Sequence, residues 1–252
     1  MRIGLTWTFL LLLGLGSHAQ PYTLTGGFQV KPILASSFLR TGPQTDSVNF
    51  SRFTVTQTPG FSLGFTLKNQ FKERLSLEFG LLMSQRNFRL AISDSTMNKT
   101  SDFRFNSFEI PVLLQTRVSL NKTNDLQGAI GLNFNLTNRD YNYPALTAGL
   151  SEAYYKNYLS RHFGIMPGIM GNLGWQKELK NGHSTYIGAS LSLPFSWLYK
   201  AYVTHQDDLP PFAPKAQKQF DLRGNYLTLD LRYYLIKDRT DLVYKPGGYG
   251  EY

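Results

Sequence analysis

The feature of this sequence that most constrains its fold is an alternation of apolar and polar residues with a period of two. Residues 61–68, for example, read FSLGFTLK, so every second side chain is large and apolar. Successive side chains of a β-strand point to opposite faces, so this pattern predicts a strand with one apolar face and one polar or small face. The pattern recurs and predicts eight strands, in residues 22–38, 61–68, 75–84, 108–115, 130–136, 163–176, 187–197 and 227–235.

The links between the predicted strands alternate in length. Short links with turn-forming residues lie at 69–72, 121–124 and 180–182, and long links lie at 39–51, 93–102, 138–160 and 204–218. A transmembrane barrel has short periplasmic turns and long extracellular loops, whereas a soluble sandwich has no reason to sort loop lengths. A lipocalin-like barrel would point its large apolar residues inward. We therefore expect an all-β fold, an eight-stranded antiparallel up-and-down transmembrane β-barrel with long extracellular loops and short periplasmic turns.

The N-terminal residues predict export. Arg2 precedes an apolar run, Leu5–Gly16, which is followed by the small-x-small tripeptide at residues 17–19. This is the order of a signal peptide, and the run is shorter than the ~20 residues that a membrane-spanning helix needs. We expect a signal peptide over residues 1–19, the barrel over 20–237 and a periplasmic C-terminal tail over 238–252. The expected location of the mature protein is the outer membrane.

The polar face of the predicted strands carries ionisable residues. An eight-stranded barrel is just wide enough for side chains to fill it, so charges on this face would share a narrow lumen and should pair. We expect Glu78 and Glu109 to act as acceptors, with Arg117 and Arg232 as donors. A hydrogen-bonded plug is favoured over a gated ion path, and the lumen network predicted from this pattern comprises Lys68, Glu78, Glu109, Arg117, Asp230 and Arg232.

Aromatic residues near the predicted strand ends fit the same interpretation. Aromatic rings prefer the headgroup zone of a membrane, and core aromatics of a sandwich would look similar in sequence. The residues expected at the headgroup level are Phe38, Phe71, Phe88, Trp175, Trp197, Tyr199 and Tyr233.

Two segments resemble a known family. Residues 108–114 (FEIPVLL) look like the "EIP-hydrophobic-LL" strand of the PorT-like outer-membrane β-barrels of the Bacteroidota, which are barrels of the OmpA/OmpX type. Residues 75–88 (LSLEFGLLMSQRNF) resemble the "L-x-L-x-x-G-L-x-x-S" strand of that family. The resemblance implies a binding or structural barrel with an accessory role in protein secretion. The chain departs from the usual barrel ending, because it continues from Lys237 to Tyr252.

An enzymatic alternative rests on the predicted outer rim. Some small outer-membrane barrels modify lipid A or cleave peptides with His, Ser and acidic residues there. The residues that such an activity would use here are Ser160, His162, His205, Asp207 and Asp208. Loop histidines are common without catalysis, and the chain has no Cys and no ligand spacing for a metal. We predict a non-enzymatic protein with no catalytic residues, no cofactor and no metal.

Charge and composition guide the choice of partners. The chain has 26 Lys and Arg against 17 Asp and Glu, but only 17% of its residues are charged. This balance and the predicted export argue against a nucleic-acid partner. We expect a monomeric barrel that contacts outer-membrane lipid or lipopolysaccharide and binds envelope or secretion-system proteins. The basic residues expected near lipopolysaccharide phosphates are Arg139, Lys156, Arg161, Lys200, Lys215 and Lys218.

Overall fold

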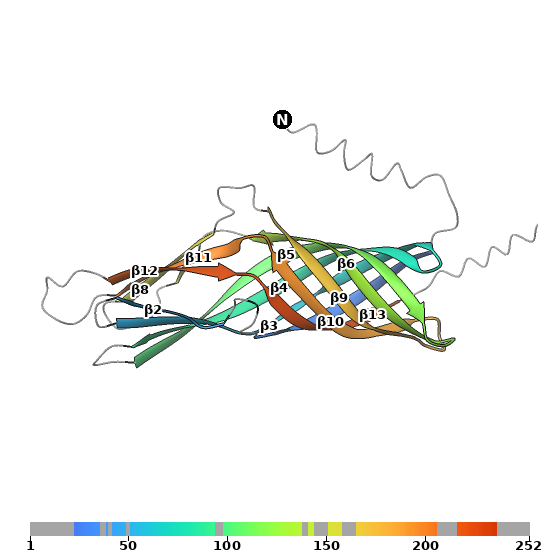
Figure 1. The fold of residues 1–252 in the computed structure, drawn as a ribbon, viewed down its shortest axis with the longest axis horizontal. Helices are drawn as coiled ribbons and strands as arrows, with labels where there is room; N and C mark the ends of the chain where they lie inside the picture. The colour runs from blue at the N-terminus through green and yellow to red at the C-terminus, as the bar shows by residue number, and fades with distance from the viewer. Residues whose placement is uncertain are drawn as a thin grey trace, which may run out of the picture.

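A computed structural model describes residues 23–35, 39, 42–48, 51–93, 98–137, 141–143, 151–157, 165–205 and 216–235. These residues form thirteen strands in two sheets (Figure 1). Among them, no helix has the length and apolar character needed to cross a membrane. The predicted signal peptide (1–19) and C-terminal tail (238–252) lie outside the described residues.

Eight of the strands close into an antiparallel ring. They follow one another around it in chain order, and the first strand pairs with both the last strand and the next ring strand, which closes the ring. This confirms the predicted eight-stranded barrel. The ring strands are β1 (Thr23–Leu34), β3 (Ser51–Lys72), β4 (Leu75–Ser93), β5 (Asn98–Ser119), β6 (Asn124–Thr137), β9 (Ile165–Glu178), β10 (Ser184–Pro194) and β13 (Tyr226–Tyr234).

Short turns join the strands at one end of the ring. Two of them lie close to their predicted positions, at residues 120–123 and 179–183. In the second turn Gly182 has φ +83°, a left-handed conformation that favours glycine. The first turn was predicted at residues 69–72, but β3 continues through Lys72 and the chain reverses at Glu73 and Arg74. The described chain also begins and ends at this end, which is therefore the periplasmic one.

The opposite end of the barrel extends into further β-structure (Figure 1). Strands β3, β4 and β5 are 22, 19 and 22 residues long, and their outer parts continue beyond the closed ring. The segments predicted as long loops therefore contain strand. The additional strands are β2 (Gln44–Val48), which pairs with β3, and a second sheet of β7 (Tyr141–Tyr143), β8 (Ser151–Asn157), β11 (Trp197–His205) and β12 (Ala216–Arg223).

A single strand reverses its apolar face between the barrel and the extension. In the barrel the apolar side chains point outward, and in the extension they point inward. In the barrel part of β4, Phe79 and Leu81 point outward, and Glu78 and Arg86 are buried inside. Two residues beyond Arg86 on the same inward face, Phe88 begins an apolar series that continues with Leu90 and Ile92. The outward face becomes polar over the same stretch. A strand that passes from hydrocarbon into water is expected to reverse its pattern in this way.

The inward apolar residues of the extension form their own core. Phe105 stacks on Tyr199 with ring centroids 3.9 Å apart, and it meets Phe103 edge-on at 5.5 Å. Phe88 (5% exposed) and Tyr199 (2% exposed) belong to this core, so their predicted place at the lipid headgroups is wrong. The core comprises Phe53, Val55, Phe88, Leu90, Ile92, Phe103, Phe105, Met166, Leu198, Tyr199, Ala201, Val203, Phe220 and Leu222.

Side-chain contacts join the two sheets of the extension along the β2–β12 seam. Gln44 Nε2 donates to the carbonyl oxygen of Asp221 at 2.9 Å, and Lys218 Nζ lies 2.9 Å from Asp46 Oδ2. The backbone N–H of Ser47 also donates to Asp46, at 2.8 Å. The hydrogen bond from Lys218 holds the pKa of the Asp46 carboxyl below its ordinary value. The seam contact is thus present above the ordinary carboxyl pKa and is lost as the pH falls through the lowered one.

We expect Lys218→Met to raise the pKa of Asp46 toward its ordinary value, because the variant removes the largest cause of the lowering. The carboxyl resonance of Asp46, followed by NMR during an acid titration, measures this change. Lys200→Met is the matched control, because Lys200 faces Asp221 at 3.9 Å rather than Asp46. Equal Asp46 titration midpoints in the wild type and Lys218→Met would contradict the seam contact.

Candidate functional site

The outer surface of the ring is apolar over a continuous band. Trp175 (50% exposed) and Tyr233 (37% exposed) lie near its periplasmic edge, where rings prefer the headgroup zone. A band of this kind needs hydrocarbon around it, because water would leave a very large apolar patch uncovered. The exposed large side chains of the band include Phe28, Val30, Phe61, Leu63, Phe65, Leu67, Phe79, Leu81, Met83, Phe108, Leu114, Ile130, Leu132, Ile169, Leu173, Ile187, Leu229 and Leu231.

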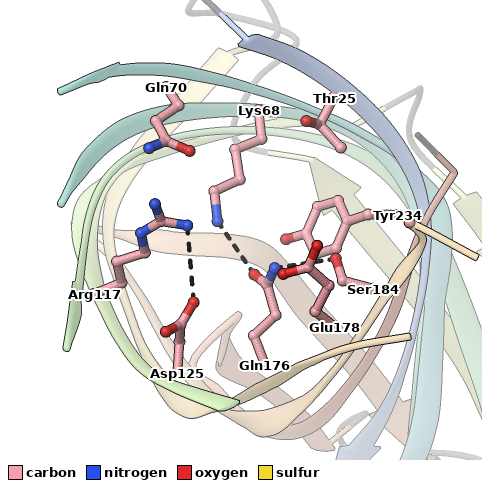
Figure 2. A pocket seen from close by; sticks show the side chains of 10 residues that line it. Thr25, Lys68, Gln70, Arg117, Asp125, Gln176, Glu178, Ser184 and Tyr234 are labelled. Carbon is pink, nitrogen blue, oxygen red and sulfur yellow. Dashed lines mark hydrogen bonds and ion pairs between the residues drawn. The ribbon is translucent and has the colours of Figure 1, made fainter. Parts of the chain in front are cut away.

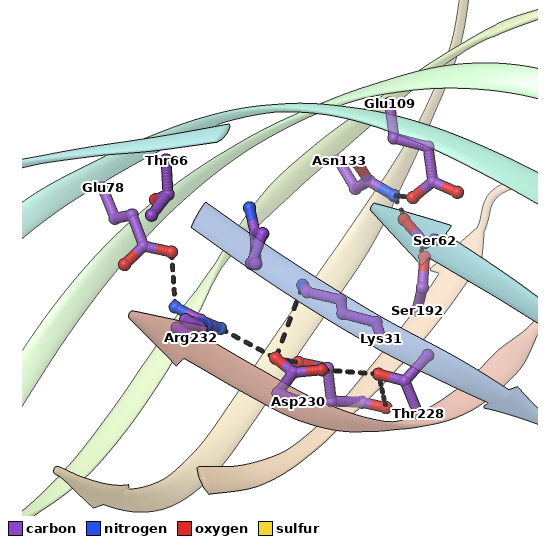
Figure 3. A network of polar contacts seen from close by, with 12 residues as sticks. Lys31, Ser62, Thr66, Glu78, Glu109, Asn133, Ser192, Thr228, Asp230 and Arg232 are labelled. Atoms are coloured by element: carbon purple, nitrogen blue, oxygen red, sulfur yellow. Dashed lines mark hydrogen bonds and ion pairs between the residues drawn. The ribbon is translucent and has the colours of Figure 1, made fainter. Parts of the chain in front are cut away.

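The inward face of the ring carries a polar network. The part of this network nearer the periplasmic end is centred on Glu78 and Arg232 (Figure 3). Arg232 Nη1 donates to Glu78 Oε1 at 2.5 Å. Glu78 also accepts from the hydroxyl of Tyr234 at 2.8 Å and from the side-chain amide of Gln115 at 2.5 Å. The guanidinium carbon of Arg232 lies 4.6 Å from the ring centre of Tyr186. Glu78 is therefore both charge-paired and hydrogen-bonded, as burial of a carboxylate requires.

Asp230 extends this network along the same strand. Arg232 Nη2 donates to Asp230 Oδ2 at 2.8 Å, and Lys31 Nζ lies 3.4 Å from the same oxygen (Figure 3). The hydroxyls of Ser190 and Thr228 donate to the two carboxylate oxygens at 2.5 and 2.7 Å. Lys31, Asp230 and Arg232 are each at most 3% exposed. Their contacts span β1, β10 and β13, so the network crosses the interior between strands.

Glu109 forms a second centre nearer the extension. Arg86 Nη2 donates to Glu109 Oε1 at 2.9 Å and to Asn135 Oδ1 at 2.7 Å. The other Glu109 oxygen accepts from Asn133 at 2.7 Å and from the hydroxyl of Tyr226 at 2.5 Å. The guanidinium carbon of Arg86 lies 5.1 Å from the ring centre of Tyr226. This cluster lies on the periplasmic side of the apolar core and fills the lumen where the barrel and the extension meet.

A small recess marks the periplasmic mouth of the lumen (Figure 2). Lys68 Nζ donates to Gln176 Oε1 at 3.3 Å, and Gln127 also donates to that oxygen. Arg117 Nη1 lies 3.7 Å from Asp125, and its Nε donates to the carbonyl oxygen of Glu73 at 2.9 Å. The recess has a volume of about 40 Å³, which holds a few water molecules at most. The lumen therefore ends in packed side chains rather than in a channel mouth.

Tyr186, on β10, is buried inside the ring beside Arg232. Gly174 and Gly188 are register partners on β9 and β10, and a Cβ on Gly174 would lie 2.6 Å from the Tyr186 ring. The missing side chains therefore let the ring lie against the backbone. This packing removes space that a pore would need.

The structure places the predicted lumen residues at different depths. Lys68, Glu78, Glu109, Asp230 and Arg232 are buried inside the ring. Arg117 lies at the mouth with its side chain 22% exposed, and it contacts neither Glu78 nor Glu109. The partner of Glu109 is instead Arg86.

The predicted lumen network does not include two buried cations that belong to it, Arg86 and Lys31. Arg86 shares the residue parity of Glu78, and extending the predicted strand beyond residue 84 would have found it. Lys31 lies in the strand whose alternation is least regular.

The structure does not describe the side chains of the rim residues considered for the enzymatic alternative. Ser160, His162, Asp207 and Asp208 lie outside the described residues, and His205 is described only as the last backbone position of β11. The enzymatic alternative therefore stays a hypothesis from the sequence.

The closed ring, its apolar band and its charge-filled lumen define the class of an outer-membrane β-barrel. A family model described as "Outer membrane protein beta-barrel domain" matches residues 19–200, and the chain belongs to this family. The match starts at residue 19, which is consistent with a preceding signal peptide, and the protein is located in the outer membrane.

Solved structures offer further comparisons. The chain is similar to the outer membrane protein AlkL, determined in DMPC bilayers, with 11% identity, 87% of this chain and 94% of that chain covered, and a TM-score of 0.39. It is also similar to the beta domain of the Bordetella autotransporter BrkA, with 10% identity, 85% and 99% covered, and a TM-score of 0.31. No curated protein matches the chain.

Proposed function

We propose that the protein is a non-enzymatic, non-conducting barrel that anchors a rigid β-structured extension outside the outer membrane, where the extension binds an envelope or secretion partner. The observation that carries this proposal is the exchange of faces along β4 and β5. The same strands enclose charged pairs in the membrane and an apolar core above it. One continuous framework therefore holds both parts.

The lumen argues for an anchor rather than a pore. Glu78, Glu109 and Asp230 each contact a buried cation, and each accepts further hydrogen bonds. A path for ions would have to separate these pairs, which costs several kcal/mol for each charge left unpaired. The polar contents of the lumen thus act as a plug.

The extension argues for a binding role. Its core contains stacked and edge-on rings from β4, β5 and β11, so its outer faces are held in a fixed arrangement. Rigid surfaces lose less conformational entropy on binding than loops do. Function at the outside of this barrel therefore rests on shaped sheet surfaces.

A finer role is also proposed: PorT-like membership and accessory action in protein secretion. The supporting feature is the FEIPVLL segment in β5. Its Glu109 is the centre of the lumen cluster nearer the extension. In a strain that lacks this chain, we expect the wild type to restore protein secretion to the medium. A variant with a disrupted extension, Leu90→Asn, should not restore it although the barrel is inserted. Secretion that is unchanged by loss of the chain would contradict this role.

We expect the purified protein to be silent in planar bilayers, because no ion path exists without breaking the lumen pairs. The double variant Arg232→Ala/Glu78→Ala removes the Glu78–Arg232 pair, the contact between Arg232 and Asp230, and the bulk of both side chains. It should give measurable conductance steps. Arg89→Ala/Asp102→Ala is the matched control, because this ion pair lies on the exposed face of the extension. Steady conductance of the wild type would overturn the anchor proposal.

A further inference from the structure

A groove lies on the outer face of β3, β4 and β5, immediately above the apolar band. It has a volume of about 420 Å³. Asn87 Nδ2 donates to the carbonyl oxygen of Pro59 at 2.7 Å, and Gln85 Nε2 donates to Asn87 Oδ1 at 3.0 Å. These contacts fix both amide side chains at the strand irregularity between Thr58 and Phe61. The residues that line this β3–β5 groove are Thr58, Gln85, Asn87, Asp102, Phe103 and Arg104.

The strand register arranges the outward side chains in rows across β5, β4 and β3. The lowest row is apolar: Phe108, Met83 and Leu63 are register partners, and they are 51%, 37% and 43% exposed. In the next row out, Asn106, Gln85 and Phe61 are register partners, and Phe61 is 36% exposed. This row combines two amide side chains with one aromatic ring, so the surface changes from hydrocarbon-facing to hydrogen-bonding across it.

The rows further out carry arginine and aspartate side chains beside the amide side chains. Arg104, Asn87 and Thr58 are register partners. Beyond them, Arg89 donates to both carboxylate oxygens of Asp102, at 2.7 and 3.0 Å. Because the Arg89 guanidinium is already paired with Asp102, a ligand on this face would meet the amide and hydroxyl groups first and the guanidinium of Arg104 beside them.

We infer that this groove binds the sugar-phosphate headgroup of lipopolysaccharide in the outer leaflet. The apolar row below the groove would contact acyl chains, which places the headgroup of the same molecule at the level of the amides. Amide, hydroxyl and carboxylate groups hydrogen-bond to sugar hydroxyls, and guanidinium groups bind phosphate with paired donors. A phospholipid headgroup presents a phosphate but few hydroxyl groups, so it would make fewer hydrogen bonds to the groove than a sugar-phosphate headgroup does.

This site differs from the cationic surface expected from the sequence. Of the six basic residues named there, the structure describes the side chains of Lys200 and Lys218 alone, and both lie on the second sheet in contacts with Asp221 and Asp46. The β3–β5 groove instead combines neutral hydrogen-bonding groups with arginine on the first sheet.

Binding of fluorescently labelled lipopolysaccharide to the immobilised full-length barrel in detergent tests the inference. Asn87→Ala/Arg104→Gln should weaken binding about tenfold, the effect expected when hydrogen bonds worth about 1.4 kcal/mol are lost. Arg223→Gln is the matched control, because it removes an exposed arginine from the second sheet, where Trp197 is its register partner. It should leave the affinity unchanged.

The inference would be overturned by equal affinity of the double variant and the wild type, by an equal loss in Arg223→Gln, or by equal affinity for phosphatidylglycerol micelles. Equal affinity for the delipidated oligosaccharide would also overturn it, since the apolar row would then contribute nothing. The replaced side chains lie on the surface, and an unchanged shift in gel mobility on boiling verifies that the variant barrel is folded. The silence of the wild type in bilayers is measured separately, so failure of the groove and failure of the anchor proposal are distinguishable.

Discussion

Replacing Arg86 with Met is expected to lower the free energy of unfolding of the barrel by about 3–5 kcal/mol, because it leaves the carboxylate of Glu109 buried without its cation. Glu109 is fully buried, and Arg86 is 2% exposed. The hydrogen bonds from Asn133 and Tyr226 remain, but neither supplies a positive charge. Urea unfolding in lipid vesicles, followed by gel mobility without boiling, measures the change.

Two further variants make this result specific. Arg86→Met/Glu109→Leu removes both charges, so it should recover much of the lost stability, because apolar replacement of a whole buried pair is often neutral. Arg89→Met removes an arginine from an exposed pair three residues along the same strand, and it should leave the unfolding midpoint unchanged. An unfolding midpoint for Arg86→Met equal to that of the wild type would show that burial of the Glu109 carboxylate does not depend on Arg86.

The closed ring could be predicted from the sequence because every ring strand has to separate lipid from a narrow lumen. That constraint puts a large apolar residue at every second position, as in Phe61, Leu63 and Phe65, and the alternation is visible without a structure. Burial of Glu78 and Asp230 follows from the same parity. Parity gives the face of a side chain, but it does not give its depth. For this reason parity alone assigns Arg117 to the lumen acceptors, although it lies at the mouth.

The choice of ion-pair partners depends on strand register. Glu109 is opposite Leu82 on β4, and its cation comes from four residues further along that strand. The apolar series of the predicted strand stops at Ser84, and Arg86 lies beyond it. A strand end that is predicted where the apolar series stops would be correct only if strands ended at the membrane surface. Here they continue into water.

The extension does not follow from the predicted strands for a related reason. Phe88 and Leu90 keep the period of two but occupy the parity opposite to Phe79 and Leu81, so they break a single-phase pattern. β5 shows the same exchange between Phe105, which is buried, and Phe108, which faces lipid. A change of phase without turn residues thus indicates a strand that crosses from lipid to water. This signal is present in the sequence and separates an extended barrel from one with irregular loops.

Truncation of Phe105 to Ala is expected to destabilise the extension by about 3–5 kcal/mol, the usual cost of removing a buried aromatic ring. Phe105 is 1% exposed, and its ring contacts Phe88, Phe103 and Tyr199. The barrel has its own polar network and its own ladder of strand pairs, so it should stay closed. We expect the extension of the variant to be cut by added protease on intact cells, while the remaining fragment keeps its heat-dependent gel mobility.

Phe108→Ala is the matched control for this experiment. Phe108 lies three residues further along β5 and is 51% exposed on the apolar band, so its loss removes contacts with lipid and leaves the extension core complete. The control should resist the protease as the wild type does. If Phe105→Ala also abolished the heat-dependent mobility, barrel and extension would be one cooperative unit. If Phe105→Ala resisted protease like the control, the apolar core would not hold the extension together. Cutting of the extension alone would show that the barrel stands without it, as an anchor must.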